Sequence, residues 1–127
     1  MTGREVIAGF VNAINAHDVE ALAALMSDDH TFIDAHGNEV VGRETMKAGW
    51  RGYFEWFSDY EIEVSQIFES DGTFGLFGYA GGSFKGKAEC SWRLPAAWRV
   101  SVKDDQVSVW QVFADTKIPF EIIERGG

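Results

Sequence analysis

Two carboxylates, Asp34 and Asp115, stand among aromatic residues in segments whose alternation is typical of strands. In "HTFIDAHG" this alternation places His30, Phe32 and Asp34 on one face. Aromatic walls desolvate a charged carboxylate and raise its pKa, which suits a general base that removes a proton beside a carbonyl. Alternatively, Asp34 accepts hydrogen bonds from backbone amides of the turn at Gly37, as Asp commonly does before glycine.

Asp115 and His30 have similar alternatives. Asp115 follows Trp110 by five positions, so a regular strand turns the two side chains to opposite faces unless a bulge intervenes. Otherwise Asp115 bonds backbone at the strand end or pairs with Lys117. His30 either orients a ligand and shares a proton with Asp34, or is a structurally satisfied histidine. Two histidines and a carboxylate on one short strand are an uncommon metal geometry, so we expect no metal site.

Helical spacing predicts three helices before the main strands. The first covers residues 3–16 behind the capping-box pair Thr2 and Glu5, and the second begins after Asp18. A short strand hairpin follows, and the third helix covers residues 43–57. The aromatic stripe of the third helix is either core or the wall of a ligand cavity. It consists of Met46, Trp50, Tyr53, Phe54 and Phe57.

From Tyr60 onward the period is close to two, which predicts four antiparallel strands with turns at Asp71-Gly72 and around Asp105. Pro95 lies inside the third of these strands and indicates a sheet edge or a bulge. We therefore predict one α+β domain over residues 1–127. In it, three N-terminal helices wrap a cone-shaped, strongly curved antiparallel sheet, whose concave face is filled by side chains or a ligand.

Charge and composition exclude several functions. Eleven Lys and Arg against 20 Asp and Glu give a net charge of −9, and no basic cluster is suited to nucleic acid or an anionic membrane. No apolar run is long enough to span a membrane. The single cysteine, Cys90, cannot form an internal disulfide, so we expect a cytoplasmic protein. Five Trp and ten Phe favour a core or cavity walled by rings.

The stretch "FVNAINAHDVEALAALMSDDHTFIDAHGNEVVGRETM", followed later by "WRV" and "DDQVSVWQVFAD", resembles the SnoaL-like proteins of the nuclear transport factor 2-like superfamily. The resemblance implies a cone with a deep apolar pocket, usually in homodimers that pair through the outer sheet face. Members include ketosteroid isomerases, polyketide cyclases, dehydratases, epoxide hydrolases and proteins without catalysis. The fold alone therefore does not give the function.

The alignment implied by this resemblance places Asp34 at the general base of ketosteroid isomerase. That enzyme's oxyanion-hole tyrosine and protonated aspartate fall on Phe10 and Ala96, which donate no side-chain hydrogen bond. The last-strand aspartate of limonene epoxide hydrolase falls near Val112. Both mechanisms are therefore disfavoured. SnoaL cyclases place an acid/base aspartate near the end of the last strand, where Asp115 is the nearest counterpart.

We expect a cofactor-independent acid/base enzyme, of the isomerase, cyclase or dehydratase type, acting on a small hydrophobic, cyclic molecule. Asp34 would be the catalytic base, and Asp115 or Tyr53 would supply a second polar contact. The alternative is a noncatalytic module that binds an apolar ligand or only dimerises. The predicted ligand-contacting residues are His30, Phe32, Trp50, Tyr53, Phe54, Trp98 and Trp110.

Overall fold

Three helices precede the main strands, as the sequence predicts, in a computed structural model that describes residues 1–124. They are α1 (Gly3–Ala16), α2 (Val19–Ala24) and α3 (Arg43–Trp56). The predicted capping box is confirmed, because the Glu5 amide donates to the Thr2 hydroxyl and the Thr2 amide donates to the Glu5 carboxylate. Asp18 caps α2 through the amide of Ala21.

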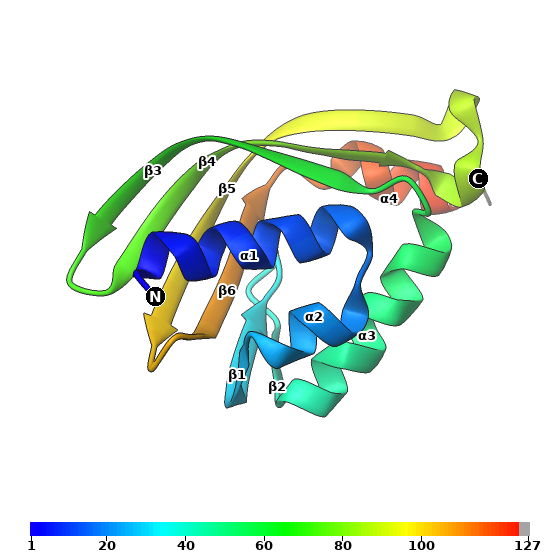
Figure 1. Cartoon of the computed structure of the whole chain (residues 1–127). Helices are drawn as coiled ribbons and strands as arrows, with labels where there is room; N and C mark the ends of the chain where they lie inside the picture. The colour runs from blue at the N-terminus through cyan, green and yellow to red at the C-terminus, as the bar shows by residue number, and fades with distance from the viewer. Residues whose placement is uncertain (125–127) are drawn as a thin grey trace.

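Six strands form one curved sheet in the order β2-β1-β6-β5-β4-β3. They are β1 (Met26–Ile33), β2 (Glu39–Val41), β3 (Glu61–Ser70), β4 (Thr73–Ser83), β5 (Ser91–Lys103) and β6 (Gln106–Ala114). Two single 3-10 turns, η1 (Phe84–Gly86) and η2 (Ala88–Cys90), connect β4 to β5. Figure 1 shows the long strands β3, β4 and β5 arching over α1. The predicted α+β cone is therefore confirmed.

Two irregular points of the sheet lie at Gly78 and at Pro95, where the sequence predicts an edge or a bulge. Gly78 faces a register shift in β3 between Val64 and Gln66, where an added Cβ would overlap the Glu63 carbonyl oxygen. Pro95 pairs only with β4, because the pairing of β5 with β6 begins one residue later. Pro95 therefore lies at a local sheet edge, where proline is tolerated.

Two features were not predicted. β1 pairs with β6 in parallel, which joins the short β1–β2 hairpin to the four later strands in one sheet. The described residues also end in a fourth helix, α4 (Lys117–Glu124), which begins where the Asp115 carboxylate accepts the Lys117 amide at 3.0 Å. The core lies between α1, α3 and the concave sheet face, around the fully buried Phe10 and Trp110. No helix within residues 1–124 is long and apolar enough to cross a membrane.

Candidate functional site

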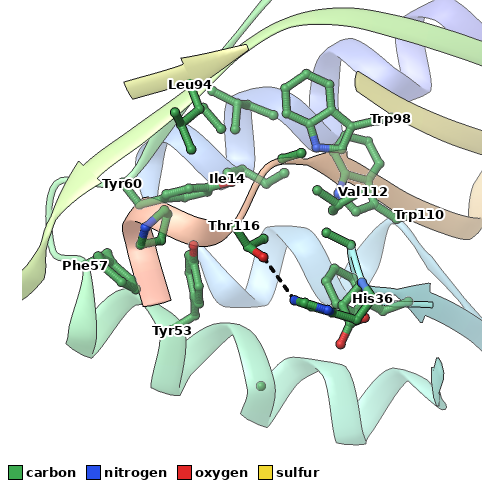
Figure 2. A pocket seen from close by; sticks show the side chains of 18 of the residues that line it. Ile14, His36, Tyr53, Phe57, Tyr60, Leu94, Trp98, Trp110, Val112 and Thr116 are labelled. Carbon is green, nitrogen blue, oxygen red and sulfur yellow. Dashed lines mark hydrogen bonds between the residues drawn. The ribbon is translucent and has the colours of Figure 1, made fainter. Parts of the chain in front are cut away.

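A cavity of about 370 Å³ lies between α3, the inner sheet face and α4. Helix α3 lines it at spacings of three and four residues, and β5 and β6 line it at spacings mostly of two, as one face of each element requires. Most of the side chains that surround it are aromatic or aliphatic, as Figure 2 shows. They include Met46, Trp50 and Tyr53 from α3, Phe57 directly after it, Trp92, Leu94 and Trp98 from β5, Trp110, Val112 and Ala114 from β6, and Pro119, Phe120 and Ile123 from α4.

The structure brings most of the residues predicted to contact a ligand to this cavity. Phe32, Trp50, Tyr53, Trp98 and Trp110 all line it, together with both carboxylates, Asp34 and Asp115. His30 and Phe54 lie outside it.

His30 is fully buried in the core behind the cavity wall. Its Nδ1 lies 2.7 Å from the carbonyl oxygen of Val107, and since a carbonyl only accepts, Nδ1 carries the proton. Burial lowers the pKa of His30, against smaller opposing effects of the Val107 hydrogen bond and of Asp29. His30 is therefore a neutral core residue packed beside Phe10, and it does not share a proton with Asp34.

Phe54 follows the cavity-facing Tyr53 by one position, so the helix turns its ring toward the α1–α2 connection. There it stacks on His17 with ring centroids 4.1 Å apart and an interplanar angle of 6°. Phe54 is therefore a packing residue between α3 and the first two helices.

The Asp34 carboxylate is held by its own turn. Oδ1 accepts from the backbone amides of His36 at 2.8 Å and Asn38 at 2.9 Å, and Oδ2 accepts from the Asn38 side-chain amide at 3.2 Å. Desolvation raises the pKa of Asp34, but the hydrogen bonds from Asn38 and His36 together outweigh it, and the net pKa is lowered. The predicted rise in pKa is wrong, and the turn-anchoring alternative agrees with the geometry.

Asp115 lies just past the end of β6, on the cavity boundary and exposed to solvent. Its Oδ1 is engaged by the Lys117 amide at 3.0 Å. This is the strand-end hydrogen bond that the sequence left open as an alternative. Because the residue has left the regular strand, the five-position spacing from Trp110 does not turn it away from the cavity.

Tyr60 is a polar cavity residue that sequence reasoning missed. The alternation that begins at Tyr60 indicates a strand with one buried face, but it does not show that this face borders a cavity. Its ring meets that of Tyr53 edge-on, with centroids 4.9 Å apart and an angle of 89°. Its backbone is fixed by hydrogen bonds from its amide to the Phe57 carbonyl, at 3.0 Å, and from His17 Nε2 to its own carbonyl, at 2.7 Å.

One side of the cavity is closed by contacts between the β1–β2 turn and α4. His36 Nε2 hydrogen-bonds with the Thr116 hydroxyl at 3.0 Å, the bond drawn in Figure 2, and its ring packs against Phe120. Across residues 1–124 no group of three or more His, Cys, Asp or Glu side chains is arranged to hold a metal ion.

A curved sheet with helices in its concavity and a ring-lined cavity between them defines the cone-shaped class of α+β proteins. The model of the SnoaL-like domain family matches residues 7–118, so the chain belongs to the SnoaL-like family. No curated protein is significantly similar to it in sequence.

Several solved structures share the fold. A putative SnoaL-like polyketide cyclase from Shewanella denitrificans is 13% identical with a TM-score of 0.82, and covers 97% of this chain and 97% of its own. An epoxide hydrolase of the LEH-like type from M. tuberculosis is 14% identical with a TM-score of 0.81, covering 98% and 86%. A hypothetical protein of ketosteroid isomerase-like fold from Catenulispora acidiphila, in complex with trimethylamine, is 18% identical with a TM-score of 0.79, covering 88% and 86%. At these identities the likeness shows the fold alone.

Proposed function

We propose that this protein binds a small, uncharged, ring-containing hydrophobic molecule in the cavity between α3, the sheet and α4. The observation that carries the proposal is the cavity itself, about 370 Å³ in volume and walled by aromatic rings from α3, β5 and β6. A pocket of this size and lining is typical of small-molecule sites. The net charge of −9 and the carboxylates at the cavity disfavour an anionic ligand.

The geometry supports binding more strongly than catalysis by Asp34. A general base needs a free lone pair and a pKa near the working pH. The Asp34 carboxylate already accepts three hydrogen bonds, which leave it little free accepting capacity and lower its pKa. Acid/base conversion of the bound molecule is the second candidate, and it is favoured by Asp115, which lines the cavity with only one of its oxygens engaged.

The test is titration with N-phenyl-1-naphthylamine, an uncharged two-ring dye whose fluorescence rises in apolar surroundings. Ala114→Phe places a ring in the cavity and should weaken dye binding by tenfold or more. The matched control is Ala8→Phe, the same change at an exposed position of α1, which should leave the affinity unchanged. Dye that does not bind the wild-type protein, or that binds both variants equally, contradicts the proposal.

We also propose that the protein forms a homodimer through the outer face of the sheet. Phe77, Ala97 and Phe113 lie side by side in register on β4, β5 and β6, and Phe68 packs against Phe77 from β3. The exposed fractions of Phe68, Phe77 and Phe113 are 58%, 47% and 49%. Clustered exposed rings of this kind mark interaction surfaces.

A further inference from the structure

The cavity contains two phenol hydroxyls without a hydrogen-bond partner among the described residues. Within residues 1–124 neither the Tyr53 nor the Tyr60 hydroxyl takes part in a hydrogen bond. The fully buried side-chain nitrogens and oxygens without a partner are His30 Nε2, Trp50 Nε1 and Trp92 Nε1, and the two phenol oxygens are not among these atoms. The two phenol oxygens are therefore unpaired but still reachable from the cavity. An apolar environment makes such unpaired groups costly, so a bound molecule that pairs them gains the corresponding stabilisation.

The two tyrosines come from different elements, and their rings meet edge-on with centroids 4.9 Å apart. Tyr53 extends from α3 and Tyr60 from the segment before β3, and Figure 2 shows both rings among the residues that surround the cavity. Desolvation raises the pKa of both phenols, and that of Tyr60 is raised further by Tyr53. Both hydroxyls therefore keep their protons at neutral pH and are able to donate.

The remaining hydrogen-bonding capacity favours a ligand that accepts. The carboxylates Asp34 and Asp115 are both bonded to backbone amides, and the oxygen that stays unengaged belongs to the solvent-exposed Asp115. The unpaired indole nitrogens of Trp50 and Trp92, two cavity residues, are donors too, but they are fully buried. A ligand oxygen with two lone pairs, such as a carbonyl, could receive both phenol hydrogens at once.

We propose that Tyr53 and Tyr60 together form a donor subsite that binds the carbonyl oxygen of an uncharged cyclic ketone. This proposal rests on the proposed function, because it requires a molecule in the cavity, and it adds the chemical class of that molecule. The rings of Phe57 and Trp92 flank the two tyrosines and would pack against the ring system that carries the carbonyl.

The test compares 1-tetralone with tetralin, two bicyclic molecules of nearly the same shape that differ in a ketone oxygen. Both are titrated as competitors of N-phenyl-1-naphthylamine against the wild-type protein, Tyr53→Phe and Tyr60→Phe. Each substitution should weaken 1-tetralone about threefold to tenfold and change tetralin less than twofold. The matched control is Tyr79→Phe on the outer sheet face, where the ring is 39% exposed, and it should change neither affinity.

Infrared difference spectra of carbonyl-labelled 1-tetralone give a second readout. The C=O stretch should move to lower frequency on binding to the wild-type protein and recover part of the shift in each Tyr→Phe variant. If the variants weaken both competitors equally, or if the C=O stretch does not move, the donor subsite is wrong while binding in the cavity stands. If neither dye nor competitors bind the wild-type protein, the proposed function fails, and this inference fails with it.

Discussion

Asp34 shows how one residue type takes opposite properties from its surroundings. Phe32 and His36 lie two positions away on either side, and desolvation alone would raise the pKa of Asp34. The turn that follows β1 instead points two backbone amides and one side-chain amide at the carboxylate. These bonds favour the charged form, so the residue stabilises the turn beside the cavity.

Substitution of Asp34 should therefore affect stability as well as any binding. Asp34→Ala removes the acceptor for the amides of His36 and Asn38 and should lower the free energy of unfolding by about 1–2 kcal/mol at pH 7. Because the pKa is lowered on folding, this contribution is fully present above the ordinary value of 3.8 and is lost as the pH falls through the folded-state pKa. Urea unfolding of both proteins between pH 7 and pH 2.5 measures it.

Asp34→Asn is the matched control, since it keeps an accepting oxygen and should lose less stability than Asp34→Ala. Side-chain carbon NMR should place the Asp34 pKa below 3.8. A value clearly above 3.8, with no loss of stability in Asp34→Ala, would instead restore the desolvated general base.

At the scale of the element, α4 is the part of the site whose contribution is easiest to isolate. Ile123 lines the cavity from this helix, whereas Ile118 is 48% exposed. Ile123→Ala should weaken N-phenyl-1-naphthylamine about threefold to tenfold, because it removes apolar surface that a bound dye would contact. Ile118→Ala makes the same chemical change away from the cavity and should leave the affinity unchanged. Equal effects of the two substitutions on the affinity for the dye would contradict a contact between α4 and the bound molecule.

The elements that sequence predicted and the ones it missed differ for a physical reason. Capping residues and period mark α1 and α2 locally, period marks α3, and alternation marks the cavity-facing Trp98 and Trp110. The parallel pairing of β1 with β6 depends on where two distant segments meet, which no local pattern contains. α4 has only eight residues and follows Asp115, which also had a plausible strand-end role, so the helical signal there was weak.

For the site, the sequence predicted which face most side chains occupy, but not their hydrogen-bond partners. Parity correctly brought Phe32, Tyr53 and Trp110 to one cavity, because a side chain's face follows from its strand or helix position. It put His30 on the same face, but that ring is buried beside Phe10, next to an irregular stretch of the β1–β6 register between Met26 and Thr31. Hydrogen-bond partners such as the amides around Asp34 depend on backbone geometry that the side-chain sequence does not specify.

For the whole molecule, the outer sheet face gives a prediction about assembly. Phe113→Glu puts a charge at one end of the row formed by Phe77, Ala97 and Phe113, and a dimer that pairs through this face would bury that charge at high cost. Light scattering after size exclusion should give twice the monomer mass for the wild-type protein and the monomer mass for the variant. Ile118→Glu, an exposed apolar position on α4, is the control and should remain dimeric. A wild-type protein of monomer mass would rule the interface out.

The parallel pair of β1 and β6 also bears on how the chain folds. Met26 pairs with Val107 and Phe32 with Trp110, so contacts that close the cone join segments near opposite ends of the sequence. Such pairings carry a large loop-closure entropy and slow folding, and during synthesis β1 has no partner in β6 until the last strand leaves the ribosome. The helices and the β3–β4 hairpin can form from nearby residues before then. The cavity, whose wall includes both Phe32 and Trp110, is therefore among the last parts of the protein to exist.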